Sequence, residues 1–303
     1  MREASGPVSP RQWLIIGAPM DGSGTDRGEA SAPGALRNAG LVAHLSAVDF
    51  GDLPVAISDA RRDPSVGIIG YQQLVHGTSV IADAVSSALH AGWRPFLIGG
   101  CCSILPGALA GMRRHNGPAK LVFVDGHLDL FTPSDTRTGE LSGMALGAVT
   151  GYWPARLTPI SGVTPLVEPA DVLALGDADA PRRRVYGAAE AATAIPDAHV
   201  FDARAILSSG PALIAERAAA IIDQDDTLFW MHVDVDVLDG SLRPAVGYVV
   251  DGGIGWSELE ILLRTFAHDP RLAGISLANL NVKCDHNGEF IDRLTSLLAA
   301  ILT

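Results

Sequence analysis

Cysteine is scarce in this sequence, and long apolar runs are absent from it. Only three cysteines occur among 303 residues, two of them adjacent at Cys101 and Cys102, so no disulfide framework is expected. A membrane span requires about 18 consecutive apolar residues, and no apolar stretch of this sequence is that long. The polar start MREASGPVSPRQ does not resemble a secretory signal. These absences predict a cytoplasmic protein with reduced thiols and no membrane partner.

Charged residues are also few, and acidic ones outnumber basic ones. They make up 18% of the chain, and the formal net charge is −12 at pH 7. Because nucleic acid and anionic membranes repel an acidic chain, neither is expected as a partner. Hydrophobic residues, in contrast, make up 48% of the sequence, which is enough for a large buried core. No linker, repeat or low-complexity block divides the chain, so residues 1–303 are predicted to form a single domain.

Short apolar runs alternate with longer helical patterns along the chain. Most runs are continuously apolar, which is typical of strands buried on both faces of a parallel sheet. The alternation predicts an α/β fold with three layers, α/β/α, around a mostly parallel central sheet. The expected strands are 13–16, 47–50, 94–98, 120–124, 171–175, 198–201, 228–233 and 274–277, the expected helices are 70–91, 105–114, 211–222, 256–266 and 289–302, and the expected long loops are 17–34 and 150–169.

Acidic residues cluster directly after two of the expected strands. Asp125, His127 and Asp129 lie in DGHLD after one strand, and Asp234 and Asp236 lie in DVD after another. Alternate residues of an extended chain share a face, and the carboxyl ends of parallel strands meet at one edge of a sheet. Four carboxylates there would repel one another unless cations lay between them. We therefore expect a centre of two divalent metal ions, with Mn²⁺ favoured by the oxygen-rich ligands.

Three stretches of the chain, taken in order, resemble the motifs of a known family. They are GAPMDGSGTDRGEASAPGALR, VDGHLDLFTPSDTRTGELSGM and HVDVDVLDGSLRPAVGYVVDGGIGWSEL. They resemble the ureohydrolases, which include arginase, agmatinase and formiminoglutamase, and the resemblance covers most of the chain. It implies an arginase-like fold, a trimeric or hexameric assembly, and hydrolysis of a linear C–N bond in a small guanidine or amidine compound.

The same resemblance assigns roles around the two ions. It implies that Asp125 and Asp234 bridge the metals, that Asp129 completes one site, and that His127 with Asp236 completes the other. A bridging water, acidified to hydroxide, would then attack the amidine carbon. As a catalytic residue, Asp129 would orient this hydroxide and pass its proton to the departing nitrogen. Substrate contacts are implied for three further residues: Thr136 and Thr138 as hydroxyl donors, and Asp179 as the partner of a substrate amine.

The chain departs from the family pattern at several positions, of which four bear on the metal and substrate sites. Cys102, in GGCCS, stands where the family has a histidine ligand, and its thiolate is expected to bind a metal. Ser142 takes the catalytic position where arginases have a proton-shuttling histidine. In the substrate pocket, Asn279 replaces a glutamate that would hold the guanidinium group, and Glu140 replaces a neutral amide. Ordinary L-arginine is therefore not the expected substrate.

One group of relatives is similar in several of these features. The Nω-hydroxy-L-arginine hydrolases of D-cycloserine biosynthesis have the same cysteine-for-histidine exchange and a similar DGHxDxxTPxxTxTGxLxGM stretch, although they keep the glutamate that is Asn279 here. An N-hydroxyguanidine is less basic than a guanidine and needs less carboxylate to hold it.

One alternative is a metal-binding member without hydrolase activity that serves as a binding or regulatory subunit. Another, a zinc-type amidohydrolase or deacetylase, would need a histidine pair, and the available histidines are scattered along the chain. His232, which lies inside a predicted strand, is interpreted as a core residue.

Overall fold

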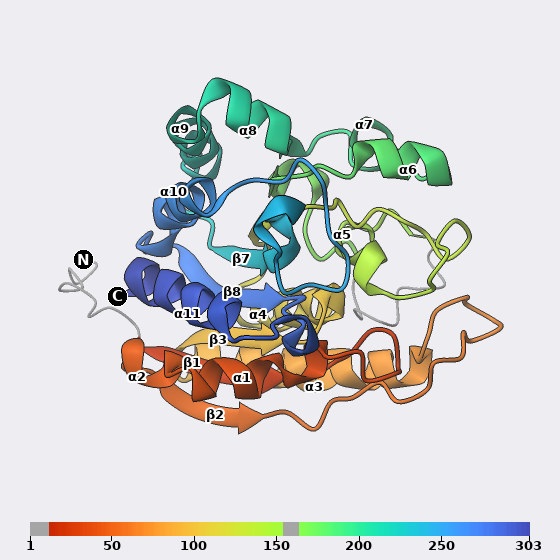
Figure 1. The fold of residues 1–303 in the computed structure, drawn as a ribbon, viewed down its shortest axis with the longest axis horizontal. Coiled ribbons are helices and arrows are strands. Elements are labelled where there is room, and N and C mark those ends of the chain that lie inside the picture. The colour runs from red at the N-terminus through yellow and green to blue at the C-terminus, as the bar shows by residue number, and fades with distance from the viewer. Residues whose placement is uncertain (1–11, 154–163) are drawn as a thin grey trace, which may run out of the picture.

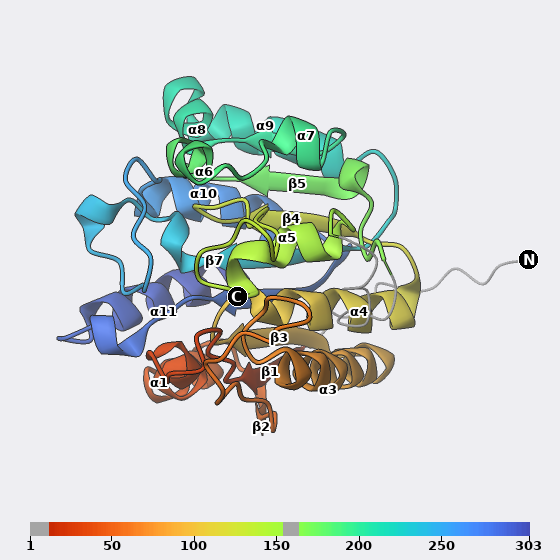
Figure 2. The same cartoon turned by 90° about the vertical axis from the view of Figure 1, so that its right-hand side faces the viewer.

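The computed structural model describes residues 12–153 and 164–303, and within them a parallel sheet runs through the molecule. Its strands are β1 (Trp13–Ala18), β2 (Val48–Asp52), β3 (Arg94–Gly99), β4 (Lys120–Val124), β5 (Val172–Leu175), β6 (His199–Phe201), β7 (Phe229–Asp234) and β8 (Leu272–Ala278). They pair in the order β2-β1-β3-β8-β7-β4-β5-β6, and Figure 2 shows the stack from β2 at the bottom to β5 near the top. All eight expected strands are present within a few residues of their predicted positions.

Alternate residues of the inner strands enter two separate cores, because successive side chains point to opposite faces of a sheet. In β4, Leu121 and Phe123 belong to one core, and Val122 and Val124 belong to the other. Over the first core lie α3 (Tyr71–His90), α4 (Leu105–Asn116) and α5 (Ala145–Val149). Over the second core lie α1 (Ala32–Asn38), α2 (Leu41–His44), α8 (Ala203–Ser209), α9 (Pro211–Ile222), α10 (Trp256–Ala267) and α11 (Glu289–Leu302). The two helical layers are visible on either side of the sheet in Figure 2, and the three-layer prediction is confirmed.

The five long helices, α3, α4, α9, α10 and α11, lie where the sequence predicts them. Shorter helices were not among those expected, for example α5, α6 (Ala180–Tyr186) and α8, each of five to seven residues. Such segments make fewer than two full turns, so they have no clear helical period in the sequence. The first expected loop, 17–34, already contains the start of α1 at Ala32. The second, 150–169, falls partly outside the described residues.

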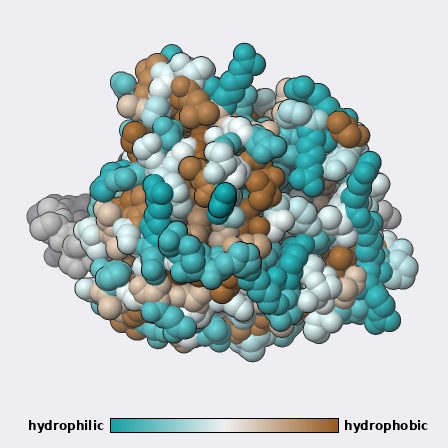
Figure 3. All heavy atoms as spheres, in the orientation of Figure 1, coloured by the Kyte–Doolittle hydropathy of each residue, from teal (hydrophilic) through white to brown (hydrophobic). Residues whose placement is uncertain are grey.

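No single helix in the described part of the chain is long and apolar enough to cross a membrane, although α8 and α9 together pass that test as a pair bent by 118°. Both helices contribute to the second core, for example through Ile206 and Ile214. Their outer surfaces carry Leu207 and Leu213, which are exposed. Figure 3 shows hydrophobic side chains near the top of this face, where Figure 1 places these two helices, and also in its middle.

Candidate metal centre

The acidic residues of the two predicted segments lie at the carboxyl ends of neighbouring strands. β4 and β7 pair with Val124 opposite Val233, so Asp125 and Asp234 are side by side. Backbone hydrogen bonds fix their side chains: the His127 amide donates to Asp125 Oδ1 at 2.7 Å, and the Asp236 amide donates to Asp234 Oδ1 at 2.8 Å. Each short turn therefore holds its first carboxylate and brings the residue two places later to the same side.

The first group of candidate ligands consists of Asp125, His127 and Asp236. One ligand atom from each lies within 4.8 Å of the others. His127 Nδ1 is 3.2 Å from Asp236 Oδ2 and 3.6 Å from Asp125 Oδ1. These spacings allow a single ion to contact all three residues, with oxygen donors outnumbering nitrogen.

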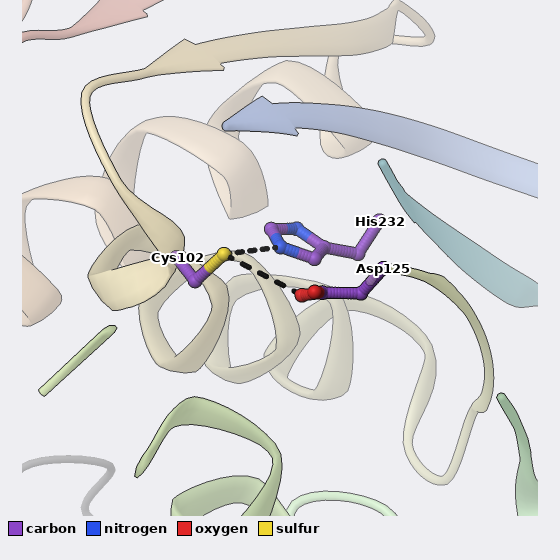
Figure 4. A group of neighbouring side chains, drawn as sticks. All are labelled: Cys102, Asp125 and His232. Carbon is purple, nitrogen blue, oxygen red and sulfur yellow. Dashed lines mark hydrogen bonds between the residues drawn. The ribbon is translucent and has the colours of Figure 1, made fainter. Parts of the chain in front are cut away.

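The second group consists of Cys102, Asp125 and His232, whose ligand atoms also lie within 4.8 Å of one another. Cys102 comes from the short 3-10 helix Cys102–Ile104 that follows β3. Figure 4 shows its sulfur facing both partners: Sγ lies 3.2 Å from His232 Nε2 and 3.8 Å from Asp125 Oδ2. Asp234 Oδ2 is nearer still, at 2.8 Å from Sγ. Because Asp125 belongs to both groups, it is placed to bridge two ions.

The electrostatics of the centre call for positive charge. Burial, together with the neighbouring carboxylates, raises the pKa of Asp125, Asp129 and Asp234 well above the usual range. Asp236 differs: burial alone would raise its pKa, but the facing His127 holds it below the ordinary value. Asp129 Oδ2 is buried and has no hydrogen-bond partner among the described residues. One imidazole cannot balance four buried carboxylates, so the donor set fits divalent cations.

A cavity of about 130 Å³ opens beside this cluster. Its inner wall includes the buried Asp129 and Asp236 with the half-buried His127, and its exposed margin includes Arg137 and Arg182. Between them lie predicted site residues from three regions of the chain: Thr136, Thr138, Ser142, Asp179 and Asn279. The structure therefore brings the predicted catalytic and substrate-binding residues, with one exception, to a single cavity.

The sequence model described as the Arginase family matches residues 11–303. The chain belongs to the arginase family. An arginase from Brevibacillus brevis is 29% identical over 296 residues, which span 96% of this chain and 97% of that protein. The native structure of Bacillus caldovelox arginase has a TM-score of 0.84 at 24% identity, covering 96% of this chain and 98% of its own. Formimidoylglutamase from Bacillus subtilis has a TM-score of 0.76 at 20% identity, covering 98% of this chain and 88% of that one.

The exception among the predicted site residues of this arginase-family chain is Glu140, which does not line the cavity. Its carboxylate accepts hydrogen bonds from Arg27, at 2.8 and 3.1 Å, and from the Tyr248 hydroxyl at 3.0 Å. Arg27 also pairs with Glu29 at 3.1 Å. The contact of Glu140 with substrate stays a prediction, and the structure places protein groups around its carboxylate.

Asn279 lies in the cavity wall and faces the candidate ligands. Its side-chain amide donates to Asp234 Oδ2 and lies 3.4 Å from Asp236 Oδ2. The residue adopts a left-handed backbone with φ of 62°, a conformation that asparagine tolerates better than most residues. The neutral amide therefore offsets no negative charge. It does donate hydrogen bonds to carboxylate oxygens that also face the metal positions.

His232 lies in the core, as the sequence interpretation has it, and the structure also places it among the candidate ligands. It is fully buried, as a core residue should be, but its Nε2 contacts the Cys102 sulfur. The signal was present in HVDVD, where His232, Asp234 and Asp236 alternate and so share one side of the strand and its extension. What the sequence could not show is that Cys102, from the end of β3, reaches the same point.

Proposed function

We propose that the chain is a hydrolase that uses two divalent metal ions to cleave a linear C–N bond in a small guanidine, N-hydroxyguanidine or amidine compound. Membership of the arginase family and relatives named as arginases support this class of activity. The observation that carries it is the shared Asp125, which links two donor groups beside one cavity. When bound, such ions acidify a water molecule and polarise the substrate, and Mn²⁺ is the ion that the oxygen-rich donors favour.

Asp129 is the residue best placed to move a proton. It borders the cavity, and its Oδ2 has no hydrogen-bond partner within the described ranges. Its position beside the cavity, with that oxygen not engaged by protein groups, suits it to receive a proton from the attacking water and to pass it to a departing nitrogen. Ser142 also lines the cavity, but a hydroxyl cannot carry the extra proton that a histidine could. Turnover should therefore favour substrates whose leaving group needs less protonation.

The amide of Asn279 favours a substrate that is less basic than a guanidinium ion. Asn279 offers no charge to a cation, and its amide hydrogen is already directed at Asp234. A carboxylate at this position would add a charge-assisted contact worth about 1.5–3 kcal/mol to a guanidinium group. An N-hydroxyguanidine is less basic than a guanidine, so the absence of a carboxylate at this position weakens its binding less. We therefore propose Nω-hydroxyarginine or a similar hydroxyguanidine as a better substrate than L-arginine.

The cavity margin favours a substrate that carries a negative group as well. The Arg137 guanidinium lies 4.1 Å from the centre of the Tyr186 ring, and Arg182 lies 5.5 Å from the same ring. Both arginines lie over this ring at the margin, and neither forms an ion pair within 4.0 Å of a carboxylate among the described residues. Asp179 is buried in the cavity wall beneath them. Two cations and one carboxylate suit the acid and amine groups of an amino acid.

The test is turnover by Mn²⁺-loaded protein of Nω-hydroxyarginine, L-arginine, agmatine and guanidino acids. We expect the highest kcat/KM for the hydroxyguanidine amino acid, and a lower value for agmatine, which has no carboxylate for Arg137 and Arg182. A variant with Asp129→Asn should lose turnover of every compound. Absence of turnover in the whole panel by metal-loaded protein would contradict the proposal and favour a binding or regulatory subunit. Assembly as a trimer or hexamer stays a prediction.

A further inference from the structure

We propose that His232 is a metal ligand, which together with Cys102 and Asp125 holds one of the two ions. This inference rests on the proposed two-metal centre but not on the proposed substrate. It assigns the two ions unequal surroundings: sulfur, nitrogen and oxygen around one, and His127 with carboxylate oxygens around the other.

The position of His232 in β7 aims its ring at the centre. His232 lies two residues before Asp234, so both side chains emerge on the same face of the strand. On the neighbouring strand β4, Phe123 lies two residues before Asp125, and its ring stacks on His232 with centroids 5.3 Å apart and planes 16° apart. The imidazole therefore lies in the layer directly beneath the two aspartates, with one flat side supported by an aromatic ring.

Hydrogen bonds leave one ring nitrogen for the ion. His232 Nδ1 is 2.7 Å from Ser276 Oγ, which also accepts a hydrogen bond from Trp230 Nε1 at 2.9 Å. Ligating histidines usually donate their second ring N–H to an oxygen of the protein, which orients the ring and fixes its tautomer. With Nδ1–H donating to Ser276, Nε2 keeps a free lone pair directed at Cys102 (Figure 4).

The distances match the edges of a coordination polyhedron. Metal–sulfur and metal–nitrogen bonds of about 2.3 and 2.0–2.1 Å at a tetrahedral angle separate the two donor atoms by about 3.6 Å, and a carboxylate oxygen gives a similar spacing to sulfur. The observed separations are 3.2 Å from Cys102 Sγ to His232 Nε2 and 3.8 Å from Sγ to Asp125 Oδ2. An ion can therefore be accommodated by side-chain shifts of a few tenths of an ångström.

In this arrangement His232 supplies the imidazole that the GGCCS segment lacks, because Cys102 stands in that segment where the family has a histidine. The thiolate comes from the helix after β3, and the imidazole comes from β7, two strands away in the sheet. Sulfur and nitrogen donors favour Zn²⁺ or Co²⁺, whereas the His127 site, with two carboxylates, better suits Mn²⁺. The centre should accordingly bind one thiophilic ion in preference to a second Mn²⁺.

The test is a Co²⁺ titration of metal-free protein followed by absorption spectroscopy. We expect a thiolate-to-cobalt charge-transfer band at the first equivalent in the unaltered protein, and loss of this band in Cys102→Ser. His232→Gln should retain the band, shift the visible cobalt bands, and weaken binding of this ion by more than about 100-fold, which exceeds the effect of losing an outer-shell partner. The control is His76→Gln, an exposed position on α3, which should bind as the unaltered protein does.

Unchanged cobalt bands and affinity in His232→Gln would overturn the inference and leave the proposed two-metal hydrolase intact. Failure of the unaltered protein to bind any ion would overturn both. X-ray absorption of the unaltered protein with one equivalent of Zn²⁺ needs no variant and decides the matter if His232→Gln does not fold. We expect one sulfur and at least one imidazole in the zinc shell, and a shell with sulfur but no imidazole would refute the ligand role.

Discussion

At the residue scale, the proposed preference for a less basic substrate depends on Asn279. The side chain lies in the cavity wall and donates to Asp234, so the position offers a hydrogen-bond donor where a carboxylate would offer charge. Cys102 lies against Asp234, and Ser142 lines the cavity, so in the proposed function these two departures concern the metal donors and the proton transfer. In that proposal, Asn279 is the departure that bears on the basicity of the substrate.

Replacing Asn279 with glutamate should shift specificity towards L-arginine. We expect the ratio of kcat/KM for L-arginine over Nω-hydroxyarginine to rise by about 10- to 100-fold, which corresponds to about 1.5–3 kcal/mol from a new charge-assisted contact. Using a ratio cancels any effect on metal binding that both substrates share. Asn279→Gln is the matched control, because it lengthens the side chain at the same left-handed position without adding charge. Equal ratios in the two variants would show that charge at this position does not set specificity.

At the scale of elements, three loops at the carboxyl edge of the sheet are joined by one polar cluster. Arg27 follows β1, Glu140 follows β4, and Tyr248 follows β7. Glu140 accepts from both of the others, and Arg27 also stacks on Tyr248, 5.0 Å from the ring centre. Because only 6% of the Glu140 side chain is exposed, these partners, rather than water, supply the hydrogen bonds to its carboxylate.

Glu140→Gln should therefore destabilise the fold. The variant replaces a bidentate ion pair with a weaker amide contact, and we expect the free energy of unfolding to fall by about 1–3 kcal/mol in chemical denaturation. Asp59→Asn is the comparison, since it removes an ion pair with Arg61 that lies at the surface, with side chains 43% and 89% exposed. That change should cost much less than Glu140→Gln, because water and salt screen an exposed ion pair. Equal losses in the two variants would rule out a structural role for the buried pair.

The strands were predictable because most of them are short, continuously apolar runs, as expected of strands covered on both faces. The two acidic segments were also predictable, since spacing by two at strand ends brings side chains together. The partners of these residues were not. Glu140 pairs with a residue 113 positions away, and His232 meets a cysteine 130 positions away. Such contacts depend on how strands are ordered in the sheet, which a single sequence does not encode locally.

At the scale of the whole molecule, the centre makes the metal-free fold sensitive to pH. Raised pKa values mean that Asp125, Asp129 and Asp234 bind protons more tightly in the folded chain than in the unfolded one. Their contribution to stability is thus fully present at low pH and is lost as pH rises from the ordinary value of 3.8 through the raised values. Asp236, with a lowered pKa, acts in the opposite sense but is one carboxylate against three. Bound metal ions would offset the repulsion between the carboxylates and would compete with protons for the carboxylate oxygens.

The number of Mn²⁺ ions bound per chain tests the central claim most directly. The measurement is elemental analysis of metal-free protein after equilibrium dialysis against Mn²⁺ at pH 8 and at pH 5. Two ions per chain are expected at pH 8, with fewer at pH 5 because protons occupy the carboxylates. Fewer than one ion per chain at pH 8 would contradict the account of a two-metal hydrolase.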